Sequence, residues 1–90
     1  MIDVESHIQT DRIEIGKYFL EIIHINDLSI EGIARGCKMS KRVVYNIIQG
    51  KGYNFDSFLK LVYYLDIDLA SLLKHVNIKQ NLSNNYISFS

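Results

Sequence analysis

The sequence contains no proline and no tryptophan, and its 90 residues include a single cysteine, Cys37. Proline interrupts helices and suits turn-rich β folds, so its absence favours a helical protein. One cysteine excludes a disulfide framework and a metal site built from several thiolates of one chain. It also fits a reducing compartment, so we expect a cytoplasmic protein that needs no metal and no other cofactor.

Two further absences exclude other classes of protein. The first residues, Met1 to Glu5, lack the basic and apolar regions of a secretory signal, and no apolar stretch approaches the roughly 18 residues that a membrane span needs. The histidines have no metal-ligand spacing, and the scattered acids suggest no Ser-His-Asp set. We therefore expect neither a membrane protein nor an enzyme.

A net charge of zero conceals a strong division along the chain. Residues 1–31 carry seven acids and two bases, which gives −5, whereas residues 32–55 carry five bases and no acid, which gives +5. Residues 56–90 hold three of each. A basic window of this kind attracts polyanions even in a neutral protein; the plainer interpretation is a solvated helix face with chance clustering.

Apolar residues recur at helical spacing as far as residue 76, and a chain of this length builds one core. We therefore predict an all-α, five-helix domain over residues 1–76 and a weakly ordered or docking tail over residues 77–90. The expected helices are residues 11–25 capped by Thr10 or Asp11, a short helix after Ser29, residues 41–49 after Ser40, a helix after Asn54, and a helix after Asp68. The last should turn Leu69, Leu72, Leu73 and Val76 inward.

The stretch from residue 29 to residue 50 carries the functional signal. Two short helices joined by a turn of about four residues have the spacing of a helix-turn-helix. On the second helix one face is apolar, and the opposite face carries Lys41, Arg42, Tyr45, Asn46 and Gln49. Lysine and arginine donate to guanine, asparagine and glutamine pair with adenine, and a tyrosine ring contacts the thymine methyl group. This face therefore predicts readout of bases in the DNA major groove.

The segment LSIEGIARGCKMSKRVVYNIIQG, with the helical ladder after it, resembles the Cro/C1-type (XRE-like) helix-turn-helix domain of lambda-type phage repressors, plasmid regulators and antitoxins. The matching positions are Ile33, Ala34, Met39, Val44, Ile47 and Gly50. The resemblance covers residues 15–73 and implies a lambda-repressor-like fold. It implies base contacts from Lys41, Arg42, Tyr45 and Asn46. It implies phosphate contacts from Ser29, Ser40, Gln49, Gly50, Lys51, Tyr53 and Asn54.

The chain departs from the family pattern in three places. One is a matched pair, Ile23 and Ile48, where the family often has an arginine and a glutamate. The other two are single positions. Ile30 stands where the family usually has a glutamine that touches phosphate. Lys38 stands where a glycine in the left-handed conformation usually shapes the turn, so either this residue is strained or the turn is reshaped.

We expect a sequence-specific regulator that binds double-stranded DNA as a homodimer on an inverted repeat and represses by occluding a promoter. The alternative is a protein-interaction module on a diverged helix-turn-helix fold, with another regulator or an antitoxin-like partner. The departures at Ile30 and Lys38 and the acidic first third keep this alternative open. The expected pairing residues are Leu69, Leu72, Val76, Tyr86, Ile87 and Phe89.

Overall fold

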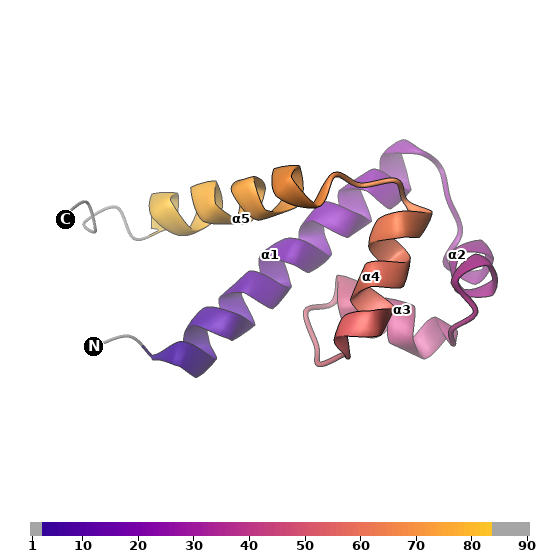
Figure 1. Ribbon diagram of the computed structural model, residues 1–90, viewed down its shortest axis with the longest axis horizontal. Coiled ribbons are helices and arrows are strands. Elements are labelled where there is room, and N and C mark those ends of the chain that lie inside the picture. The colour runs from indigo at the N-terminus through magenta and orange to yellow at the C-terminus, as the bar shows by residue number, and fades with distance from the viewer. Residues whose placement is uncertain (1–2, 84–90) are drawn as a thin grey trace.

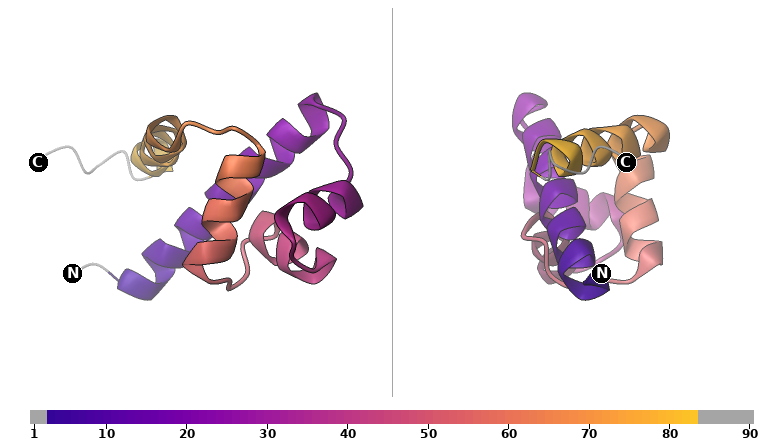
Figure 2. Two further views of the ribbon diagram at one scale, coloured as in Figure 1. Left: turned by 45° about the vertical axis from the view of Figure 1, so that its right-hand side comes forward. Right: turned by 90° about the vertical axis from the view of Figure 1, so that its left-hand side faces the viewer.

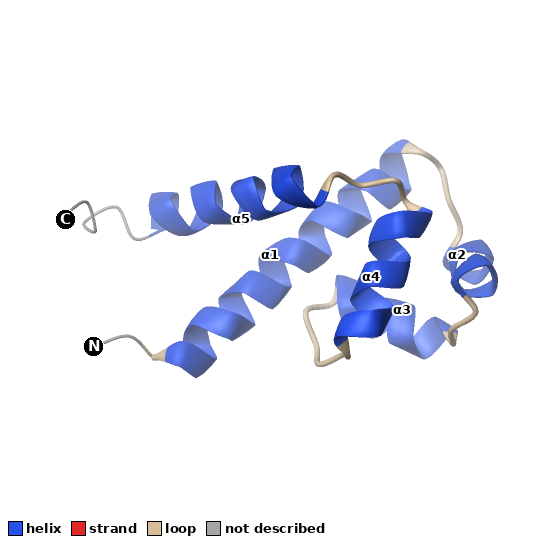
Figure 3. Ribbon diagram, viewed as in Figure 1, coloured by secondary structure: helices blue, strands red, loops and turns tan. Residues whose placement is uncertain are grey.

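The computed structural model describes the backbone of residues 3–83 and the side-chain environments of residues 3–76 (Figure 1). Its helices are α1 (Val4–Ile25), α2 (Ile30–Cys37), α3 (Lys41–Ile48), α4 (Phe55–Tyr64) and α5 (Leu69–Ser83). Figure 3 shows helices and loops only, with no strand between residues 3 and 83. The predicted all-α, five-helix domain is confirmed. Within those residues no helix is long and apolar enough to cross a membrane.

The helices begin where a short polar side chain accepts a backbone N–H group from the first turn. Ser29, Ser40 and Asn54 accept from Gly32, Val43 and Ser57, at 3.0, 3.3 and 2.8 Å, as the sequence predicts. The Asp68 carboxylate likewise accepts from the Ala70 N–H and the Ser71 hydroxyl at the start of α5.

The predicted start of the first helix is wrong. Neither Thr10 nor Asp11 caps it, because Asp3 accepts from the Ser6 N–H group and α1 begins at Val4. No helix-breaking residue separates Val4 from Asp11, so a helix nucleated at Asp3 continues through the polar segment. The Ser6 hydroxyl and amide also hold the pKa of the Asp3 carboxyl below its ordinary value.

The first four helices all end in the same backbone motif, in which one residue adopts the left-handed conformation. These residues are Asp27, Lys38, Gly50 and Asp66, with φ between 54° and 76°. In each case the N–H of this residue bonds a carbonyl three residues back, and the next N–H bonds one five residues back. Only α3 uses glycine at this position.

The core lies between α1 and the other helices. Its fully buried members are Phe19, Ile33, Val44, Ile47, Leu61 and Leu72. The Phe19 ring meets the Phe58 ring edge-on, with centroids 5.9 Å apart. Leu73 does not belong to this core: it is 52% exposed, because it lies next to, and not on, the face of α5 that buries Leu72 and Val76.

Two glycines set the contact between α1 and the end of α3. A Cβ atom on Gly16 would lie 2.5 Å from the carbonyl oxygen of Ile48 and 2.8 Å from that of Ile47. A Cβ atom on Gly50 would lie 2.9 Å from Ile13 Cγ1 and 3.0 Å from its Cα. The backbones therefore approach more closely than any side chain permits.

Figures 1 and 2 show α1 as the longest element, with α2, α3 and α4 beside its second half and α5 running back across it at an oblique angle. Tyr18 of α1 meets His75 of α5, with ring centroids 5.0 Å apart. Beyond this contact the two helices diverge toward the chain ends. α5 continues past the predicted domain end at residue 76 as far as Ser83. The remaining tail, with Tyr86, Ile87 and Phe89, lies outside the described residues.

Substituting Gly16 tests the α1–α3 contact. Gly16→Ala should lower the free energy of unfolding by about 1–3 kcal/mol, because the new methyl group overlaps backbone that cannot rotate away. The gain in helix propensity, about 1 kcal/mol, works in the opposite direction. Urea denaturation followed by circular dichroism measures the difference. Gly52→Ala is the control, since nothing lies within 4 Å of a Cβ there and its φ is not positive. Equal stabilities of the two variants would rule out the tight contact.

Candidate nucleic-acid interface

The two sides of α3 differ completely in exposure. Val44 and Ile47 are fully buried, whereas Lys41, Arg42, Tyr45 and Gln49 are exposed and Asn46 is half-buried. No acidic residue stands in the first turn. Packing of α3 on α1 and α2 therefore presents two cations, two amides and an aromatic ring to solvent on one helix.

The α2–α3 turn contains a residue in the left-handed conformation. Lys38 has φ 56° and ψ 47°, which is left-handed, and its N–H bonds the Arg35 carbonyl at 3.2 Å. The next N–H, that of Met39, bonds the Ala34 carbonyl at 3.0 Å, and Met39 packs against the core. The sequence left open whether Lys38 is strained or the turn is reshaped. The structure has a strained Lys38, because the flanking hydrogen bonds and the Met39 contact fix the turn.

Ile30 begins α2 and is half-buried against the core. At this position the chain uses packing where a glutamine would offer hydrogen bonds. The start of α2 therefore presents the capped Ser29 and the exposed Glu31, and Ile30 adds no polar group to it.

Most of the expected phosphate contacts are exposed, at helix ends and in the loop between α3 and α4. They are Ser29, Ser40, Gln49, Lys51 and Asn54.

Gly50 is a correction to that expectation. It is buried against Ile13, and its N–H already bonds the Ile47 carbonyl at 3.2 Å, so it shapes the corner and offers no amide to a phosphate.

Tyr53 connects the same loop to the core and to α1. Its half-buried ring stacks on Phe58, with centroids 6.3 Å apart. Burial raises the pKa of the Tyr53 hydroxyl, and the positive charge of Arg12 opposes part of that rise. Since Ile13 abuts Gly50, the preceding residue Arg12 lies beside this loop.

Sequence reasoning did not include Arg12 in the candidate site. It is remote from the basic window, and nothing near it in the sequence indicates a role. Gly16 was missed too, although a glycine within an amphipathic helix is a signal of close packing. Gly16 allows α1 to lie against the α3–α4 corner, and Arg12 gives α1 a positive charge there.

Cys37 and the ionisable clusters suggest no reactive centre. Cys37 is buried, its sulfur lies 3.7 Å from the Lys60 carbonyl oxygen, and burial raises the pKa of its thiol. A raised pKa disfavours the reactive thiolate at neutral pH. Over the described part of the chain, no group of three or more His, Cys, Asp or Glu residues could hold a metal ion.

No protein-family model, no characterised protein and no solved structure matches the chain. What the molecule does must therefore be inferred from its own residues.

Glycine at position 38 should stabilise the protein. Lys38→Gly removes the left-handed penalty of about 1–2 kcal/mol and adds unfolded-state entropy, for a net gain of about 0.5–1 kcal/mol. Thermal and urea unfolding measure it. Lys60→Gly removes the same exposed charge from the interior of α4 and should instead cost about 1 kcal/mol. Changes of the same sign in both variants would show that Lys38 carries no backbone strain.

Proposed function

We propose that this protein is a sequence-specific regulator that binds double-stranded DNA and represses transcription by occluding a promoter. The observation that carries the proposal is the exposed face of α3, where Lys41, Arg42, Tyr45 and Gln49 stand clear of the core. The surrounding residues 32–55 contain five bases and no acid. The resemblance of residues 15–73 to the Cro/C1-type domain supports the same function.

In this mechanism α3 enters the major groove. Arg42 and Lys41 donate to guanine, Asn46 pairs with adenine, and the Tyr45 ring contacts a thymine methyl group. Phosphates on either side are held by the exposed groups at the starts of α2 and α3 and by the α3–α4 loop, with Lys51 as its cation. Arg12 adds a charge from α1 at that corner.

One recognition helix covers few base pairs, so the protein acts as a homodimer on an inverted repeat with half-sites about one helical turn, roughly 34 Å, apart. The pairing surface expected on α5 needs correction. Leu72 and Val76 are buried in the chain's own core, at 0% and 5% exposure, and Leu69 packs against it. Leu72 and Val76 are therefore not available to a second copy, whereas Leu69 is only partly buried.

A second candidate is the protein-interaction module. It is favoured by Ile30, which replaces a phosphate-binding side chain with an apolar one, and by exposed Phe55 and Tyr63, at 66% and 77% exposure. In that case the basic window is a solvated surface with weak affinity for any polyanion.

Oligonucleotide selection followed by salt titration separates the two functions. Selection from random duplexes should enrich a palindrome. Affinity for it should fall steeply with salt, on the order of a thousandfold between 50 and 200 mM if about six phosphates are contacted. Fluorescence anisotropy measures the slope. A shallow slope with no enriched sequence would exclude the repressor and leave the interaction module.

Two substitutions should separate base contacts from phosphate contacts. Arg42→Ala should weaken operator binding by about 1–3 kcal/mol and relax the preference at one base pair. Lys51→Ala should weaken all sequences alike and reduce the salt slope by about one. Lys60→Ala on α4, which removes the same charge as Lys51→Ala from an exposed position, should change neither quantity. If all three variants behave alike, α3 is not the reading helix.

A further inference from the structure

A hollow of about 330 Å³ lies between the end of α2 and the second half of α4. Its volume falls within the range of about 300–1,000 Å³ that is usual for small-molecule sites. Cationic and aromatic side chains line it, and none of them comes from α3 or from the loop after α3. The lining residues are Gly36, Cys37, Lys38, Lys60, Tyr63 and Tyr64. This hollow is therefore separate from the proposed DNA-binding face.

The charges around the α2–α4 hollow have one sign. Of the described residues that line it, two are lysines and none is acidic. Lys60 lies near its floor, because the positive charge of Lys60 opposes part of the rise that burial causes in the pKa of the Cys37 thiol. Two lysines beside one hollow repel each other, and a bound anion removes that repulsion. The hollow therefore favours an anionic ligand.

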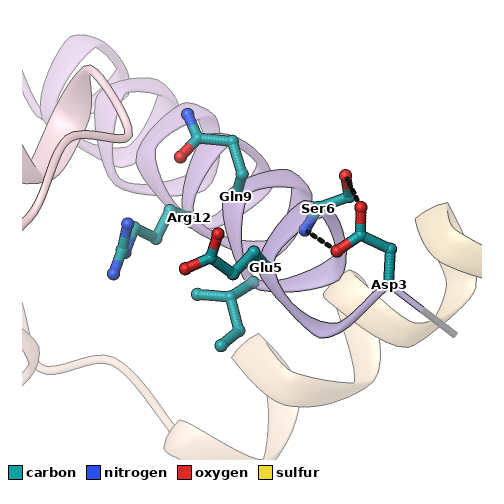
Figure 4. Close-up of a pocket in the computed structure, with 6 residues that line it drawn as sticks. Asp3, Glu5, Ser6, Gln9 and Arg12 are labelled. Carbon is teal, nitrogen blue, oxygen red and sulfur yellow. Dashed lines mark hydrogen bonds between the residues drawn. The ribbon is translucent and has the colours of Figure 1, made fainter.

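A larger hollow in the described chain has a different character. It measures about 460 Å³, lies along the first turns of α1, and is lined by two carboxylates, one guanidinium group and no aromatic ring. Figure 4 shows Glu5 and Arg12 on the same side of the helix and the Asp3 carboxylate bonded to Ser6. Its mixed charges favour no ligand of one sign, so the contrast leaves the α2–α4 hollow as the candidate site.

The backbone of Lys38 is a second, independent observation. In the described chain the residues with a left-handed φ are Asp27, Lys38, Gly50 and Asp66. Glycine has no Cβ atom to clash, and the short aspartate side chain can hydrogen-bond nearby backbone, but lysine has neither advantage. Backbone strain of this kind is concentrated at functional sites. At Lys38 the strain holds a cation at the edge of the hollow.

The aromatic part of the hollow consists of two neighbouring tyrosines on α4. A Cβ atom on Gly36 would overlap the Tyr64 ring, so this ring lies directly on the backbone of α2. The Tyr63 ring beside it is 77% exposed. An exposed tyrosine ring can stack on a flat heterocycle, and a tyrosine hydroxyl group can donate a hydrogen bond to a phosphate oxygen. The hollow therefore offers a stacking surface next to its two cations.

We propose that the α2–α4 hollow binds a free nucleoside polyphosphate, with the base stacked on the Tyr63 ring and the phosphates between Lys38 and Lys60. Lysine binds phosphate as a point charge, so two lysines from two separate elements suit a chain of phosphates better than a single anion. The exposed ring adds affinity that a bare polyphosphate cannot gain. The site uses no residue of α3, so nucleotide binding does not depend on DNA binding.

Isothermal titration calorimetry of the full chain tests the two parts of the ligand separately. ATP is a sufficient probe, because stacking on an exposed ring tolerates any base. Tripolyphosphate, which lacks the ring, and adenosine, which lacks the phosphates, should each bind about tenfold more weakly than ATP or not at all. If ATP does not bind, or if tripolyphosphate binds as tightly as ATP, the proposal is wrong.

Lys38→Gly separates ligand binding from stability. It should weaken ATP binding about tenfold, although the same change relieves backbone strain and stabilises the fold, so unfolding cannot explain the loss. Lys51→Gly is the matched control, since it removes an exposed lysine of the same basic window that does not line the hollow. This variant should bind ATP like the wild type. Equal losses in the two variants would mean that ATP is attracted by the basic window as a whole, which would overturn the site.

Tyr63→Ala tests the stacking surface. It should weaken ATP binding about tenfold and leave the weaker binding of tripolyphosphate unchanged, because only ATP has a ring to stack. Tyr45→Ala, which removes an exposed ring from α3, should not affect ATP binding. Equal effects of these two substitutions would contradict the assignment of the base to Tyr63.

A short single strand, decathymidylate, separates a free nucleotide from nucleic acid as the ligand. ATP should bind more tightly than this strand to the wild type, since the hollow has the volume of a small-molecule site. Tighter binding of decathymidylate that is lost in Lys38→Gly would assign the hollow to nucleic acid and overturn the free nucleotide.

Discussion

The close contact between α1 and the end of α3 is the constraint on which the candidate site depends. At Gly16 and Gly50 the two backbones meet without side chains between them. This contact fixes the axis of α3 relative to α1, and the axis decides which residues of α3 are buried. Val44 and Ile47 are excluded from solvent as a result, and Lys41, Arg42 and Tyr45 are left outside. The same contact brings Arg12 to the loop that holds Tyr53.

Glycine is used sparingly, and its positions follow from space more than from conformation. Three of the four left-handed helix ends carry Asp27, Lys38 or Asp66, so the chain accepts some strain there. Only at Gly50 does a left-handed φ coincide with a backbone neighbour close enough to exclude a Cβ atom. Gly36 shows the related case inside α2, where the Tyr64 ring occupies the space that a side chain would fill.

The division of charge along the sequence becomes a division in space. The acids of the first third lie mainly on α1, whose first turns extend away from the body, and the basic window forms α2, α3 and the loop after it. The contact between α1 and α3 is made by glycines, backbone and apolar side chains, and most charged residues of both segments remain at the surface. A neutral chain can therefore present a basic face to one partner and an acidic helix to another.

Local features of the sequence determined the helix starts after Ser29, Ser40 and Asn54, because an N-cap is a contact between residues three apart. The faces of α3 followed equally from helical periodicity. Other features needed the tertiary structure. The role of Gly16 depends on a carbonyl more than thirty residues away, at Ile48. The burial of Leu72 and Val76, which removes them from any interface, depends on how α5 lies against α1. A sequence pattern identifies an apolar face, but only packing decides whether the chain's own core or a second molecule covers it.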